Sequence, residues 1–154
     1  MNFPILSSLI LLPIIGALFL FFTKDKDGNN LTAKYVSLFT TIVNFLISIY
    51  LWILFDQSTS SFQFIEDREW INGFINYKVG VDGISILFII LTTFITPLCI
   101  ISVNNTVKVR LRDFLIAILI MESFMIGVFC ALDLVVFYLF FEAGLIPMFL
   151  IIGI

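Results

Sequence analysis

Apolar residues fall into five long runs, and polar residues are concentrated in the shorter stretches between them. Each run is close to the roughly 20 residues that a helix needs to cross a hydrocarbon core about 30 Å thick. We therefore predict an all-α, polytopic transmembrane bundle of about five helices, forming a single membrane domain over residues 1–154. The predicted helices cover residues 3–22, 32–55, 84–103, 113–131 and 134–154, and a longer polar loop covers residues 56–83.

The composition supports this class, because 61% of the residues are hydrophobic and only 12% are charged, against about 25% charged in soluble domains. We expect a lipid bilayer around the chain, and no basic tract indicates nucleic acid as a partner. Cys99 and Cys130 each lie inside an apolar run, without the spacing of a metal or cluster site, and are interpreted as packing residues.

Basic residues are distributed unevenly among the predicted connections. Six of them flank the first and third connections, whereas the loop at residues 56–83 has two basic residues and five acids. By the positive-inside rule, the six basic residues are cytoplasmic, which places the N-terminus and the long loop in the periplasm of a bacterium. The six residues are Lys24, Lys26, Lys34, Lys108, Arg110 and Arg112.

Small polar side chains recur on one face of the second predicted helix. Their spacings of four, three and four residues align them on a 3.6-residue helix. They are Ser37, Thr41, Asn44 and Ser48, and the next helix carries a weaker stripe of Ser85, Thr92 and Thr96. These residues either form helix-packing contacts, worth about 0.6 kcal/mol each, or line a hydrated path, and the sequence leaves both readings open.

Two glutamates lie deep inside predicted helices. Glu122 follows Arg112 by ten residues, which places it about 15 Å from the cytoplasmic boundary. Glu142 lies about 12 Å from the periplasmic boundary by the same rise, so the two share nearly one depth. The tight connection at residues 132–133 makes their helices antiparallel neighbours, and the carboxyls either face one another or each face a further partner.

A carboxylate at the centre of a bilayer costs at least about 2.5–3.5 kcal/mol and therefore indicates a function. Glu122 and Glu142 serve either as uncharged hydrogen-bond donors in packing or as a proton relay; at matched depth we favour proton or cation translocation. Pro147 removes the hydrogen bond to the Ala143 carbonyl, beside Glu142, and so either frees a polar atom near the carboxyl or forms a simple kink.

Four motifs together resemble subunit M of proton-pumping NADH:quinone oxidoreductase, the respiratory complex I subunit that corresponds to mitochondrial chain 4. They are GVDGIS at residues 80–85, MES at 121–123, GVFCALDL at 127–134 and FYLFFEAGLIPM at 137–148. The resemblance is to the N-terminal part of that subunit and covers the whole chain. Sodium/proton antiporter subunits and membrane-bound hydrogenases share the superfamily.

The resemblance implies roles for four acidic residues. It implies that Glu142 belongs to an antiporter-like proton channel, with its charge set by a lysine on a later helix, and that Glu122 lies on the neighbouring helix of the same hydrated region. Asp82 and Asp133 match family positions too. Their simplest physical role is to cap the third and fifth predicted helices at the periplasmic end.

The resemblance also implies that redox chemistry occurs elsewhere. NADH, FMN, iron–sulfur clusters and quinone would be held by partner subunits, and the chain would contact other membrane subunits of complex I, especially neighbouring antiporter-like ones, in the bacterial inner membrane. As a subunit it would contribute to a proton-translocating NADH:ubiquinone reductase, although the chain alone has no redox site.

The chain departs from the family in length, because subunit M continues into the lysine-bearing helices. We therefore expect a truncated or split reading frame that is inactive alone. Two alternatives remain: a sodium/proton antiporter subunit of the same superfamily, and a nonfunctional structural membrane fragment.

Overall fold

Five helices form the body of the molecule. The computed structural model describes residues 4–23, 31–71, 73–103 and 110–153. The helices are α1 (Ile5–Phe22), α2 (Leu31–Leu54), α3 (Gly83–Val103), α4 (Leu111–Cys130) and α5 (Leu134–Gly153). All five are long and apolar enough to cross a membrane. They confirm the predicted helix bundle, and their bounds lie within two residues of those predicted.

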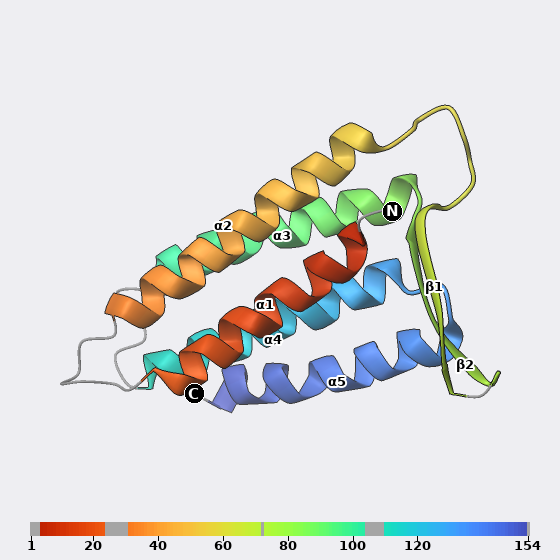
Figure 1. Ribbon diagram of the computed structural model, residues 1–154. Coiled ribbons are helices and arrows are strands. Elements are labelled where there is room, and N and C mark those ends of the chain that lie inside the picture. The colour runs from red at the N-terminus through yellow and green to blue at the C-terminus, as the bar shows by residue number, and fades with distance from the viewer. Residues whose placement is uncertain (1–3, 24–30, 72, 104–109, 154) are drawn as a thin grey trace.

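The helices run side by side, with α4 at the centre of the bundle (Figure 1). α4 packs against α1, α3 and α5 and also touches α2, while α2 packs against α1 and α3. As predicted from their tight connection, α4 and α5 are neighbours. The bundle therefore buries α1 and α4 to a similar extent and leaves α5 at one side of the molecule, where its buried residues are Val136 and Pro147.

Two glycines allow close helix contacts. A Cβ atom on Gly16 of α1 would lie 2.7 Å from the Thr40 side chain of α2, and one on Gly127 of α4 would lie 2.8 Å from the Phe140 ring of α5. Real Cβ atoms do not approach other atoms so closely. Small residues at such crossings are typical of membrane helices, whose association depends on van der Waals packing.

The stretch between α2 and α3 contains an antiparallel hairpin of β1 (Gln63–Ile71) and β2 (Ile75–Val81). We predict residues 56–83 as a loop, so these strands differ from the expectation from sequence. β1 is mostly exposed, whereas β2 ends in three buried residues. Because β1 lacks a regular alternation of buried and exposed positions, its sequence gives only a weak strand signal.

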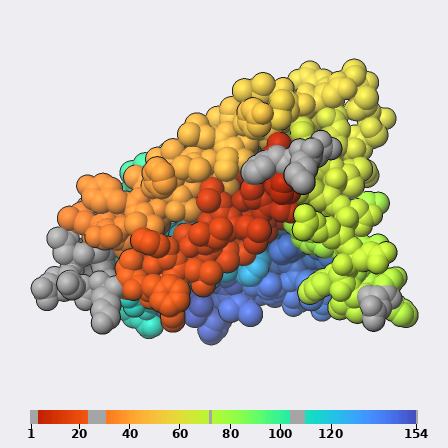
Figure 2. All heavy atoms as spheres, viewed as in Figure 1, coloured from red at the N-terminus to blue at the C-terminus, as the bar shows by residue number. Residues whose placement is uncertain are grey.

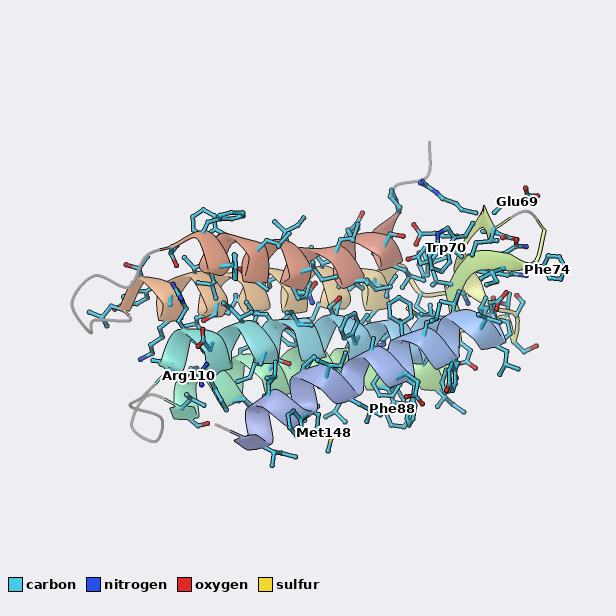
Figure 3. The ribbon with its side chains drawn as sticks, turned by 90° about the horizontal axis from the view of Figure 1, so that it is seen from below. Glu69, Trp70, Phe74, Phe88, Arg110 and Met148 are labelled. Carbon is cyan, nitrogen blue, oxygen red and sulfur yellow. The ribbon has the colours of Figure 1, made fainter. Side chains whose placement is uncertain are left out.

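The hairpin is attached to the connection between α4 and α5. The backbone N–H of Leu132 donates a 2.9 Å hydrogen bond to the Lys78 carbonyl, and Val79 forms an isolated β-bridge with Ala131. Figure 2 shows the hairpin covering one end of the helices. Figure 3 shows Trp70 and Phe74 at this end and Arg110 at the opposite end, so the two ends of the bundle differ in chemical character.

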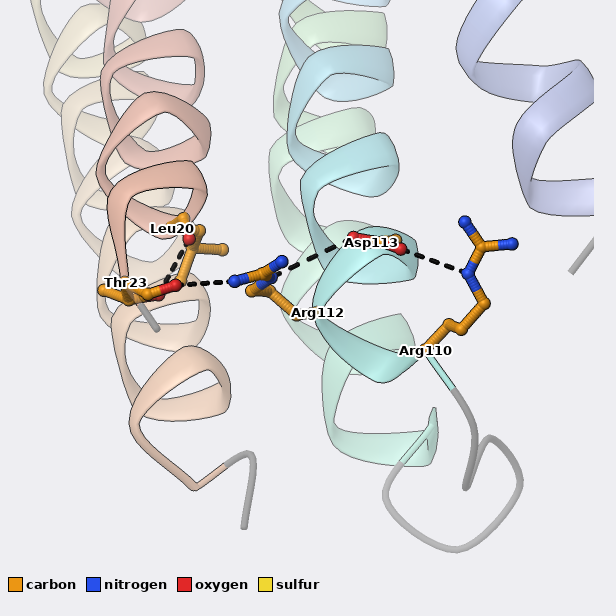
Figure 4. A network of polar contacts seen from close by, with 5 residues as sticks. All are labelled: Leu20, Thr23, Arg110, Arg112 and Asp113. Atoms are coloured by element: carbon orange, nitrogen blue, oxygen red, sulfur yellow. Dashed lines mark hydrogen bonds and ion pairs between the residues drawn. The ribbon is translucent and has the colours of Figure 1, made fainter. Parts of the chain in front are cut away.

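Of the six basic residues predicted to be cytoplasmic, those that the structure describes lie at the end of the bundle opposite the hairpin. Arg112 Nη1 donates a 2.6 Å hydrogen bond to the Thr23 carbonyl at the end of α1, and Arg110 Nε lies 3.2 Å from Asp113 Oδ2 (Figure 4). Arg112 thus ties α4 to α1. The predicted basic residues Lys24, Lys26 and Lys108 lie outside the described residues.

Candidate functional site

Glu122 lies on the buried face of α4 and is only 2% exposed. The Nδ2 atom of Asn44, on α2, donates a 3.1 Å hydrogen bond to Glu122 Oε1. The side chain of Asn44 is completely buried as well. The structure therefore joins two residues that are 78 positions apart in the sequence through one buried contact between helices.

Two oxygen atoms of this pair have no hydrogen-bond partner among the described residues. They are Glu122 Oε2 and Asn44 Oδ1, both of which are buried. Buried polar groups are nearly always hydrogen-bonded, because leaving one unpaired carries its full desolvation cost. The two atoms are therefore exceptions to the usual pairing of buried polar groups.

The predicted polar face of α2 is confirmed as an interior face. Ser37, Thr41, Asn44 and Ser48 are all completely buried. The Ser48 hydroxyl lies 2.8 Å from the Thr93 hydroxyl of α3, one helical turn from Asn44. Ser37 and Thr41 instead donate to carbonyl groups of their own helix. The polar face of α2 therefore combines hydrogen bonds within its own helix with two separate contacts to other helices, Asn44 to Glu122 and Ser48 to Thr93.

Two of the three residues in the weaker stripe on α3 are buried. Thr92 and Thr96 are each 8% exposed, and their hydroxyls donate to the carbonyls of Phe88 and Thr92. Ser85 has intermediate burial near the start of the helix. Thr93 is fully buried and lies outside the predicted polar stripe, and its hydroxyl forms a contact between α3 and α2.

Glu142 occupies a different face of the bundle from Glu122. Glu142 is exposed, and it forms no hydrogen bond or ion pair with any residue that the structure describes. Phe140, two residues earlier on α5, packs against Gly127 and Phe124 of α4. Because two residues advance a helix by about 200°, Glu142 points away from α4. The two carboxyls therefore do not face each other.

Pro147 is one of the two buried residues of α5, and it lies five residues after Glu142. Its ring nitrogen has no hydrogen to donate to the carbonyl of Ala143. Ala143, next to Glu142, has intermediate burial. α5 thus combines an exposed carboxylate with a backbone carbonyl, on the neighbouring residue, that lacks its usual helical N–H donor.

Two aspartates cap helices at the hairpin end. Asp82 Oδ1 accepts hydrogen bonds from the backbone N–H groups of Ser85, at 2.7 Å, and Ile84, at 3.1 Å. The hydrogen bonds from Ser85 are the main reason that the pKa of Asp82 lies below its ordinary value of 3.8. At the start of α5, Asp133 Oδ1 accepts a 2.8 Å hydrogen bond from the Val135 N–H. Both carboxylates pair backbone donors of a first helical turn.

A mostly apolar cavity of about 800 Å³ lies between α1, α4, α5 and the hairpin. Its walls include Ile10 of α1, Phe124 of α4 and Leu139 of α5, with Arg68 and Tyr77 on the hairpin side. Burial raises the pKa of the Tyr77 phenol above its ordinary value of 10.0. This cavity can hold an aliphatic group, whereas neither candidate glutamate lines it.

No metal site is formed by the part of the chain that the structure describes, since no three His, Cys, Asp or Glu residues are grouped there. Both cysteines are free thiols, with Cys130 buried and Cys99 exposed. The polar side chains buried inside these helices carry carboxyl, amide and hydroxyl groups.

Comparisons with known proteins confirm the resemblance that the motifs indicate. The chain is 53% identical over 152 residues to NADH-quinone oxidoreductase subunit M of Rhodobacter capsulatus, a match covering 97% of this chain and 29% of that protein. It is 45% identical to NADH-ubiquinone oxidoreductase chain 4 of Marchantia polymorpha, covering 97% of this chain and 30% of that protein. The match is to the N-terminal part of these proteins. No protein-family model matches the chain.

The fold is similar to that of a chain in a solved structure of respiratory complex I from Thermus thermophilus with bound NADH. The TM-score is 0.73 at 26% sequence identity, and the match covers 92% of this chain and 27% of that chain. The chain thus spans about 30% of the length of its curated relatives and is homologous to a membrane subunit of complex I.

Proposed function

We propose that this chain supplies the N-terminal helices of the antiporter-like, proton-translocating membrane subunit of NADH:quinone oxidoreductase. The observation that carries the proposal is the 53% identity to a subunit M over 97% of the chain. The five apolar helices agree with a membrane subunit. In this role the chain takes part in coupling NADH oxidation and quinone reduction to proton pumping.

Glu122 and Glu142 are the proposed proton-carrying groups. Glu122 lies in the bundle interior with an amide partner, whereas Glu142 lies on the uncovered side of α5. A carboxylate facing lipid at mid-membrane carries a large free-energy cost. We infer that a cation, from helices beyond these five, approaches the outer face of α5 and sets the charge of Glu142. The family resemblance implies a lysine in that position.

The backbone around Glu142 supports proton exchange at this face. The carbonyl of Ala143 lacks its helical donor because of Pro147. Such a carbonyl can accept a hydrogen bond from water or from a protonated carboxyl beside it. Loosened helices next to charged groups recur in membrane transporters. Asp82 and Asp133 have a supporting role, since they fix the first turns of α3 and α5.

The redox cofactors belong to partner subunits in this proposal. NADH, FMN, the iron–sulfur clusters and quinone would be bound outside this chain, whose neighbours would be other membrane subunits, especially antiporter-like ones. The chain would lie in the bacterial inner membrane with α1 starting on the periplasmic side. The basic residues Arg110 and Arg112, at the end opposite the hairpin, support that orientation.

Purification of the chain from its own membranes tests this function. An affinity tag on the chain should retain an assembly with NADH:quinone reductase activity in a mild detergent. In sodium-free vesicles that assembly should move protons when NADH is added. Purification of the chain without any reductase activity would contradict the proposal. Sodium/proton exchange that requires no NADH would instead identify an antiporter subunit.

A further inference from the structure

We propose that Asn44 is a positioning residue for Glu122, and that its amide pairs in both directions with the protonated carboxyl. The inference deepens the proposed function, on which it rests for the role of Glu122 as a proton carrier. Nothing in the family resemblance or the comparisons assigns a role to Asn44. The pair is built from two side chains that are each at least 98% buried, one on α2 and one on α4.

The first half of the pairing is present in the structure. Asn44 Nδ2 donates to Glu122 Oε1 at 3.1 Å. An amide N–H can donate to a carboxyl oxygen in either protonation state of the acid. This hydrogen bond therefore holds the carboxyl in one orientation whether or not it carries a proton.

The second hydrogen bond of the proposed pair joins the two remaining oxygens. Glu122 Oε2 and Asn44 Oδ1 are buried, and neither has a partner in the described part of the chain. With Glu122 ionised, both atoms are acceptors and cannot pair with each other. A proton on Oε2 makes that oxygen a donor, and Asn44 Oδ1 is an acceptor on the amide that already contacts the acid. Protonation of Glu122 Oε2 therefore allows a hydrogen bond from this oxygen to Asn44 Oδ1.

The neighbouring polar groups are engaged elsewhere. Ser123, next to Glu122 on α4, donates its hydroxyl to the Ile10 carbonyl of α1. The hydroxyl of Ser48 pairs with that of Thr93. Asn44 differs from these hydroxyl residues because a primary amide presents a donor and an acceptor on one planar group. The Asn44 side chain can therefore donate one hydrogen bond to a carboxylic acid and accept another from it.

Infrared spectroscopy of the full chain in phosphatidylcholine vesicles tests this pairing directly. In a pH series, the C=O band of protonated Glu122 is identified as the band that is missing in Glu122→Gln. In Asn44→Leu, this band should shift to higher wavenumber, towards a carboxylic acid without hydrogen bonds. Asn44→Ala removes the same donor and acceptor but leaves a small side chain, and should also move the band.

Ser48→Ala is the matched control, because it removes a buried hydrogen bond one turn away on the same helix. It should leave the Glu122 band in place. Circular dichroism checks that each variant retains its helices, and Asn44→Ala decides the question if Asn44→Leu does not fold. An unchanged band in a folded Asn44 variant would overturn the inference.

The infrared and proton-movement measurements distinguish a failure of this inference from a failure of the proposed function. If Glu122→Gln leaves NADH-driven proton movement intact in the assembly, the proton-carrying role of Glu122 fails, while the spectrum still decides whether Asn44 holds the acid. If the band does not move with Asn44 but Glu122→Gln reduces proton movement, the proposed function stands and the positioning role is wrong.

Discussion

Ser7, in the first turn of α1, donates hydrogen bonds from both its backbone N–H and its hydroxyl to the same oxygen of Glu66 on β1, each at 2.9 Å. The Ser7 hydroxyl also lies 3.1 Å from the Tyr77 hydroxyl on β2. One serine therefore connects the start of the bundle to both strands of the hairpin. This contact complements the attachment of β2 to the α4–α5 connection.

The first prediction concerns this contact. Ser7→Ala should loosen the hairpin, because it removes two hydroxyl contacts from a part-buried site, at a cost of about 1–3 kcal/mol. Hydrogen exchange of the backbone amides of residues 75–81 should become faster. Ser8→Ala is the control, since the Ser8 hydroxyl bonds to the Ile5 carbonyl within α1. Equal exchange rates in the two variants would refute the role given to Ser7.

The second prediction concerns the α4–α5 contact. Gly127→Ala should destabilise the bundle by about 1–3 kcal/mol, because its Cβ would meet the Phe140 ring at 2.8 Å. Unfolding of the chain in mixed micelles with increasing SDS measures the change.

Gly144→Ala provides the control for Gly127→Ala on the partner helix. Its Cβ would lie 3.8 Å from Phe124, an ordinary contact, and alanine favours a helix over glycine by up to about 1 kcal/mol. We therefore expect this variant to be neutral or more stable. Equal effects of the two substitutions would show that α4 and α5 do not pack as described.

The third prediction concerns the cap of α3. Asp82→Ala should lower the free energy of unfolding by about 0.5–2 kcal/mol, the usual effect of losing an N-cap. Because hydrogen bonds from Ser85 lower the pKa of Asp82, its folded state favours the ionised carboxylate. The contribution is complete above the ordinary value of 3.8 and is lost as the pH falls below it, through the folded pKa.

Asp82→Asn separates the cap from its charge. Asparagine retains an acceptor oxygen but does not titrate, so this variant should keep most of the stability at pH 7. It should also lose less stability than the parent protein between pH 4 and pH 2. SDS unfolding at both ends of that range supplies the comparison. A parent and an Asp82→Asn variant with the same acid dependence would exclude this role for Asp82.

The hydrophobic pattern was sufficient to predict the helices, because a membrane span imposes a length and a composition that few other structures need. The period of the polar residues also placed Asn44 on an interior face. The pattern could not show the partner of Asn44, since the rotation of α2 against α4 depends on packing across the bundle. Thr93 was missed for the same reason.

The hairpin and the orientation of Glu142 depend on distant parts of the chain. The strands at residues 63–71 and 75–81 are held by contacts with α1 and with residues 131–132, which no local periodicity records. The helical rise predicts similar membrane depths for Glu122 and Glu142, and this stays a prediction. Their separation onto different faces follows from Phe140, which turns towards Gly127 and leaves Glu142 on the outer side.

The central claim is that Glu142 and Glu122 carry protons and that proton movement depends more strongly on Glu142. The most direct measurement is the number of protons moved per NADH oxidised by the tagged assembly in sealed vesicles. Glu142→Gln should abolish most of this movement, Glu122→Gln should have a smaller effect, and the exposed hairpin variant Glu69→Gln should have none. Undiminished proton movement in the Glu142→Gln assembly would contradict the account.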